Sequence, residues 1–87
     1  MIVRILSEGQ YRVDGPTLEQ IKHLDEDLMV ALTDNNADRF HHLLNEVAIL
    51  VRSGQALDST HLVESDLILP AVDTTLTEAK RLFEDPA

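Results

Sequence analysis

The sequence has no cysteine and no tryptophan, and its 87 residues include only three glycines. Without cysteine the chain can form no disulfide, zinc–thiolate site or thiol nucleophile, so it is suited to a reducing cytosol. The glycines are not spaced as in a loop that cradles phosphate groups, and no serine has the context of a nucleophile elbow. These absences remove the most recognisable nucleotide-binding and covalent catalytic sites.

Basic residues are also few. The sequence has seven lysines and arginines but sixteen aspartates and glutamates, which gives a formal charge of −9. A phosphate backbone or an anionic lipid surface would repel this charge over a Debye length of about 8 Å. We therefore expect no nucleic-acid binding and no direct membrane binding. The longest apolar runs, residues 47–51 and 67–69, are far shorter than the ~20 residues that cross a bilayer. The N-terminus lacks the basic segment of a secretory signal, so we expect it to be structural.

Two segments predict β-strands. Residues 1–13 predict a β-hairpin, because β-branched residues are frequent in 1–6, Gly9 interrupts the run and alternation resumes after it. The first of these strands is apolar on both faces, so we expect it at the centre of a sheet or covered on both sides. Residues 66–69 are a short candidate for a buried strand that ends at Pro70, and they predict a third strand beside the hairpin.

Residues 17–53 predict two amphipathic helices that fold back on each other across a turn at residues 34–36. Thr17 and Gln20 have the spacing of a capping box at the start of the first helix. Gly54 is expected to end the second helix in the left-handed conformation. The turn is so short that the two helices must be antiparallel neighbours.

The remaining segments complete a single α+β domain over residues 1–87. Residues 55–64 are polar and lack periodicity, so they predict a loop. Thr75 and Glu78 repeat the capping-box pattern and predict a short last helix over residues 75–84. The expected order is ββααβα, with the hairpin and the third strand packed against the helical hairpin.

Histidine and carboxylate pairs are the best candidates for a metal site. His23 with Asp27, and His42 with Glu46, are each four residues apart, which places imidazole and carboxylate on one helical face. The antiparallel arrangement separates the two pairs by roughly 10 Å, so one ion cannot join them. His41 and His42 diverge by about 100° and do not form a catalytic dyad. We expect solvated ion pairs here, no metal or other cofactor, and no enzymatic activity.

Three apolar residues are out of place on the predicted helices. Val30 lies about 180° from Ile21 on the first helix, and Ile49 lies about 180° from Phe40 on the second. Met29 flanks the apolar stripe of its helix. Single exposed apolar residues are normal, but small domains also use helical faces to bind partners. Met29, Val30 and Ile49 are therefore the candidate partner-contact residues, although Val30 and Ile49 are expected at different levels of the hairpin.

Three segments give the chain a resemblance to a known family. They are residues 1–5 with 8–11 (MIVRI and EGQY), residues 65–70 (SDLILP), and residues 73–76 with Glu78 (DTTL). In this order, around a two-helix middle that contains Leu24 and Asp25, they resemble the PspA-associated domain, PspAA. The chain departs from the family pattern in having Ala71 where a second proline is common, and in lacking a Gly-Leu-Ile-Pro-like tail. Any role of that tail is therefore not carried over.

The resemblance implies a cytoplasmic accessory of the PspA envelope stress response that acts by protein contact, and it supplies no catalytic residues. Its partner would be a PspA-family coiled-coil protein, which would recruit the acidic domain to the inner face of the membrane. The alternative is a self-associating structural module without a PspA partner. In that case the helical hairpin or the edge of the N-terminal sheet would form a homodimer.

Overall fold

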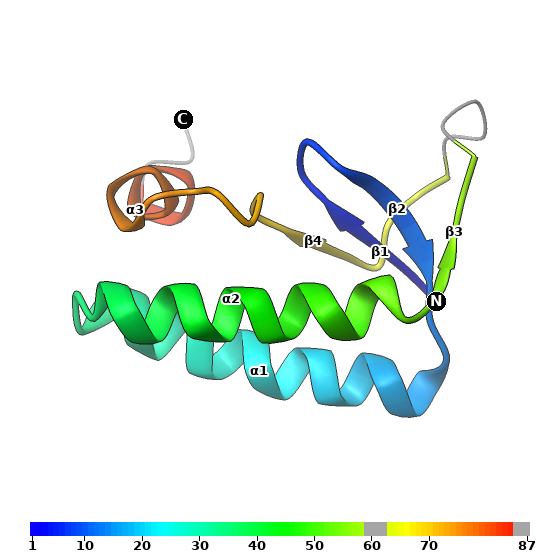
Figure 1. Cartoon of the computed structure of the whole chain (residues 1–87), viewed down its shortest axis with the longest axis horizontal. Coiled ribbons are helices and arrows are strands. Elements are labelled where there is room, and N and C mark those ends of the chain that lie inside the picture. Colours follow the sequence, from blue (N-terminus) through cyan, green and yellow to red (C-terminus); the bar gives the residue numbers. More distant parts are fainter. Residues whose placement is uncertain (59–62, 85–87) are drawn as a thin grey trace.

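The computed structural model describes residues 1–58 and 63–84. A helical hairpin lies along one side of a small sheet, and a short helix lies beside the sheet, over the far end of the hairpin (Figure 1). The elements are β1 (Ile2–Ile5), β2 (Gly9–Arg12), α1 (Gly15–Thr33), α2 (Ala37–Arg52), β3 (Gln55–Ala56), β4 (Leu67–Leu69) and α3 (Leu76–Glu84). The α+β class and the order ββααβα are confirmed, with β3 as an addition. None of the described helices is long and apolar enough to cross a bilayer.

The sheet is mixed and has the strand order β3-β2-β1-β4. Strand β1 pairs antiparallel with β2 and parallel with β4, so that Val3 lies between Tyr11 and Leu67. The N–H of Leu6 donates to the main-chain oxygen of Leu69 at 3.0 Å and extends the parallel ladder. The central position predicted for the first strand is therefore confirmed.

Strand β3 lies within the segment predicted to be a loop. It pairs antiparallel with β2, with Ala56 opposite Tyr11 and Gln55 opposite Arg12. Two residues are too few to show the alternation typical of a strand, so the sequence carries no local signal for β3. The pairing depends instead on α2 ending beside β2.

The core has two parts, and Leu24 packs against both. One part lies between the sheet and the adjoining halves of α1 and α2, and its buried residues are Val3, Ile5, Val13, Leu18, Ile21, Val47, Ala48, Val51 and Leu69. The other lies between the far halves of the two helices and α3, and its buried residues are Leu28, Ala31, Leu32, Phe40, Leu43, Leu44 and Ala79. The sheet and α3 thus cover different lengths of the same helical hairpin (Figure 1).

Helix α1 begins two residues before its predicted start. The predicted capping box at Thr17 is wrong, because Asp14 is the N-cap and its Oδ1 accepts a hydrogen bond from the N–H of Thr17 at 2.8 Å. Pro16 fits the first turn, where a main-chain N–H would have no helical partner. At α3 the predicted cap is confirmed, since the Thr75 hydroxyl oxygen accepts from the N–H of Glu78 at 3.1 Å.

Gly54 allows close packing and is not a left-handed helix stop. Helix α2 ends with Ser53 as its C-cap at a φ of −70°, and Gly9 is the glycine with positive φ in the described chain. A Cβ on Gly54 would overlap the main-chain oxygen of Arg12 and lie 2.9 Å from a methyl carbon of Val13. The left-handed prediction is therefore wrong, and glycine is needed because the α2–β3 connection passes directly against β2.

An ion pair joins the turn of the β-hairpin to the end of α2. The guanidinium of Arg52 donates to both carboxylate oxygens of Glu8, at 2.5 and 2.8 Å, and the Tyr11 hydroxyl donates to the same carboxylate at 2.7 Å. These hydrogen bonds, chiefly that from Arg52, lower the pKa of Glu8 to about 2. The carboxylate is therefore ionised at neutral pH and holds the two elements together.

Gly54→Ala is expected to lower the free energy of unfolding by about 2 kcal/mol, because overpacking against main-chain atoms forces β2 or the end of α2 to move. Gly15→Ala is the matched control, since nothing lies within 4 Å of its added Cβ and alanine favours a helix. Urea denaturation of both variants measures the difference. Equal stability of the two variants would contradict the role assigned to Gly54.

Glu8→Gln is expected to remove roughly 1 kcal/mol of stability at neutral pH, as for a well-formed but solvent-accessible pair. Folding lowers the pKa of Glu8 from its usual 4.5 to about 2, so the stabilising effect is complete above pH 4.5 and is lost as the pH falls towards 2. Unfolding free energies of the two proteins, measured from about pH 7 to about pH 2, should therefore converge at the acid end. A difference that stays constant with pH would assign the effect to something other than the ion pair.

Candidate functional site

The sheet has one face against the helices and one face turned away from them. Val3 and Ile5 point to the helices and are buried, with exposed fractions of 0% and 1%. Because side chains alternate along a strand, Ile2 and Arg4 lie on the other face. The strand register extends this alternation across the sheet. This outer sheet face consists of Ile2, Arg4, Gln10, Arg12, Gln55, Leu57, Asp66 and Ile68.

Two arginines lie near the centre of the outer sheet face. Arg4 is directly opposite Gln10 on β2 and Ile68 on β4, and Arg12 is directly opposite Ile2. Side chains opposite each other have Cβ atoms about 5 Å apart, and diagonal neighbours are about 7–8 Å apart. Arg4 and Arg12 are therefore diagonal neighbours of like charge.

The positive charge of these arginines is not neutralised within the described chain. Both side chains are exposed, and neither Arg4 nor Arg12 forms an ion pair with a described residue. The carboxylate of Asp66, at the margin of the face, accepts a hydrogen bond from the N–H of Ile2 at 2.8 Å. The face therefore presents two guanidinium groups on a chain whose formal charge is −9.

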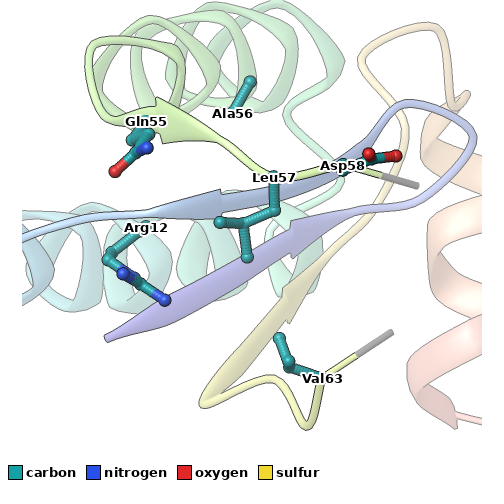
Figure 2. Close-up of a pocket in the computed structure, with 6 residues that line it drawn as sticks. All are labelled: Arg12, Gln55, Ala56, Leu57, Asp58 and Val63. Carbon is teal, nitrogen blue, oxygen red and sulfur yellow. The ribbon is translucent and has the colours of Figure 1, made fainter. Parts of the chain in front are cut away.

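Apolar side chains lie beside the arginines. Ile68 is 56% exposed and Val63 is 44% exposed, whereas Leu57 is half-buried. Figure 2 shows Leu57 between Arg12 and Val63 in an open pocket of about 490 Å³. Gln55, Ala56 and Asp58 complete the lining. Arginine beside exposed apolar groups is a composition typical of protein-contact surfaces.

Gln10 fixes the segment that crosses the outer sheet face. Although it lies on this face, it is only 8% exposed. Its amide nitrogen donates to the main-chain oxygen of Val63 at 2.6 Å and to the Ser65 hydroxyl at 2.9 Å, and its amide oxygen accepts from the N–H of Val63 at 3.4 Å. Gln10 thus holds residues 63–65 against the sheet and sets the position of Val63.

The predicted partner-contact residues lie on the helices and not on the sheet. Val30 is 57% exposed and Ile49 is 66% exposed, as their helical positions predict. Met29 is half-buried and packs against the second core cluster. Val30 is near the turn between the helices, whereas Ile49 is near the far end of α2. A docking role for these three residues stays a prediction.

The histidines of the helical hairpin have separate surroundings. The Nε2 of His42 lies 3.0 Å from the carboxylate of Glu46, on an exposed surface. The Nε2 of His41 lies 3.3 Å from the main-chain oxygen of Thr74, which joins α2 to the segment before α3. Within the described residues, no three histidine, aspartate or glutamate side chains come together as ligands for a metal ion.

The sequence gives only a weak signal for the outer sheet face. Arg4 is the charged residue in an otherwise apolar first strand, and charged residues are rarely buried without a partner. Ile68 has no such signal, because it is flanked by two leucines, and the prediction of a buried strand over residues 66–69 is wrong at this position, where Ile68 is exposed. Whether Ile68 points to the core or away from it depends on its register with β1, and the pairing of strands distant in sequence is not encoded in a local pattern.

Gln10→Ala is expected to lower the free energy of unfolding by about 1 kcal/mol, because the hydrogen bonds to residues 63–65 are lost. Amide exchange at Val63 should become faster at the same time, since its N–H loses its acceptor. Gln55→Ala is the matched control, because Gln55 is exposed on the same face. Urea denaturation and NMR hydrogen exchange make the comparison, and unchanged exchange at Val63 would contradict the role of Gln10.

Comparison with known proteins gives a match to one family. The family model described as "PspA-Associated protein" matches residues 1–87, which is the whole chain. Searches of curated proteins and of solved structures found no match. The family match agrees with the resemblance of the strand and cap segments, and it shows that this chain belongs to the PspA-associated protein family.

Proposed function

We propose that this chain is a non-enzymatic protein-binding accessory of the PspA-type envelope stress response. In this proposal it associates with a PspA-family coiled-coil protein. The observation that carries the proposal is the family match over residues 1–87, because the family name implies association with PspA proteins. The proposal therefore concerns a contact between proteins and assigns no chemical step to the chain.

The described surface supports a role in protein contact. Large apolar side chains are exposed on both layers, with Val30 and Ile49 on the helices and Ile68 on the sheet. The pocket beside Leu57 is open, and it is lined by residues whose types suit a protein partner as well as a small molecule. His41 contacts the main-chain oxygen of Thr74 and His42 contacts Glu46, which supports roles for both within the fold.

The net charge supports an indirect route to the membrane. A chain with a formal charge of −9 is repelled by anionic lipid headgroups. We propose a cytoplasmic protein that its partner recruits to the inner face of the membrane.

The chain is expected to form a complex with the PspA homologue of the same organism when both are mixed at micromolar concentrations, a range typical of regulatory contacts. Size-exclusion chromatography with light scattering measures the mass of the complex. An unrelated coiled-coil protein of similar charge serves as the control. Separate elution of the two proteins at these concentrations would contradict the proposed function.

A homodimer is the second candidate, and the edge position of β4 favours it. Strand β4 ends the sheet on one side, and Ile68 is exposed on it. Such an edge can pair with the same strand of a second copy. Sedimentation velocity separates the two candidates, because a monomer that is independent of concentration excludes the homodimer.

A further inference from the structure

Helix α1 and the outer sheet face differ in the charged residues that they carry. Helix α1 carries four acidic residues, Glu19, Asp25, Glu26 and Asp27, and one lysine, Lys22. The outer sheet face instead has Arg4 and Arg12 as diagonal neighbours without an ion pair in the described chain. Arg52, by comparison, is neutralised by Glu8. The outer sheet face therefore offers an acidic partner two guanidinium groups, which lie beside the carboxylates of Asp66 at the margin and of Asp58 in the pocket.

Arg4 and Arg12 are suited to carboxylates on a partner. Like charges at diagonal positions of a sheet repel each other, and a carboxylate placed between them relieves that repulsion. Guanidinium groups bind carboxylates through two parallel hydrogen bonds, which gives the contact a defined geometry. The exposed side chains of Ile68 and Val63 lie on the same side of the sheet and supply apolar area next to the charges.

The dimensions of the face fit a single helix. Four strands at a spacing of about 4.8 Å place the outer strands about 14 Å apart, and an α-helix with its side chains is about 10 Å wide. Residues 63–65 already lie against this face at Gln10, so the helix would pack beside them and contact Val63. The inner face of the same sheet already packs against helices (Figure 1). A helix on the outer face would place helices on both sides of the sheet and give an arrangement of three layers.

We propose that the outer sheet face binds an acidic amphipathic helix of the PspA-family partner. Arg4 and Arg12 contact carboxylates that flank the apolar stripe of this helix, and Ile68 and Val63 pack against the stripe itself. The inference rests on the proposed function and specifies its surface. Coiled-coil helices supply this chemistry, because charged residues border their apolar seam.

The test compares the binding of charge-reversed variants to the PspA homologue of the same organism. Arg4→Glu with Arg12→Glu is expected to raise the Kd at least tenfold, because like charges then face each other across the contact. Lys22→Glu with Arg39→Glu is the matched control, since it changes the net charge equally but acts on exposed positions of the helices. The control is expected to stay within about threefold of the wild-type Kd. Thermal melts check that each variant is folded.

A second variant tests the apolar part of the contact. Ile68→Thr keeps a β-branched side chain in β4 and removes apolar area, so it is expected to weaken binding severalfold without a change in charge. Val30→Thr with Ile49→Thr makes the matching uncharged change at the exposed apolar residues of the helices, which are the contact predicted from the sequence. The Ile68 variant is expected to raise the Kd more than the Val30 and Ile49 variant does. Isothermal titration calorimetry measures all of these affinities.

The outcomes separate the inference from the proposed function. If the wild-type protein binds and the Arg4 and Arg12 reversal matches its control, the inference is wrong while the proposed function stands. If only the Val30 and Ile49 variant loses binding, the inference is also wrong, and the contact with the PspA homologue lies on the helices. If the wild-type protein does not bind the PspA homologue, the proposed function fails and the inference fails with it.

Two further measurements test the other occupants of this face. A wild-type dimer that the Arg4 and Arg12 reversal dissociates would assign the face to a second copy of this chain. Flotation with anionic phosphatidylglycerol vesicles that depends on the same arginines would assign it to lipid headgroups. Either result would overturn the inference, and we expect a monomer that does not float with the vesicles.

Discussion

The structure depends on the length of the helical hairpin relative to the sheet that covers it. Helix α1 has 19 residues and is about 28 Å long at 1.5 Å per residue. The sheet spans about 14 Å between its outer strands, so it cannot bury the whole apolar side of the hairpin. Helix α3 covers the remaining half, where Ala79 is fully buried. The division of the core into two parts follows from this difference in length.

Helix α3 is held against the helical hairpin by one contact from its middle and one from the segment just before it. Lys80 of α3 donates a hydrogen bond to the side-chain oxygen of Asn35 in the turn between α1 and α2. His41 of α2 contacts the main-chain oxygen of Thr74, just before α3. These contacts position α3 by the turn and by α2, so the placement of α3 does not depend on direct packing with the strands. The two halves of the molecule are consequently joined mainly through the helices that they share.

Much of the fold could be predicted from the sequence, because helical periodicity and short apolar runs are local signals. The two long helices, the central first strand and the Thr75 cap follow from such signals. Residues whose roles depend on distant contacts could not be assigned. Gly54 is fixed by the oxygen of Arg12, and β3 is fixed by its pairing with β2. The outer sheet face depends on distant strand pairing in the same way, whereas the exposure of Val30 and Ile49 follows from helical geometry alone.

The parallel pairing of β1 with β4 has a consequence for synthesis on the ribosome. The N–H of Ile2 bonds to the carboxylate of Asp66, 64 residues later, so the sheet joins segments that are far apart in the sequence. The hairpin and both long helices can form before β4 leaves the exit tunnel, but until then one edge of β1 has no partner strand. Closing such a distant contact is slow relative to local structure. The pairing that places Ile68 beside Arg4 is therefore among the last parts of the fold to form. A chain whose synthesis has not reached β4 lacks the complete outer sheet face.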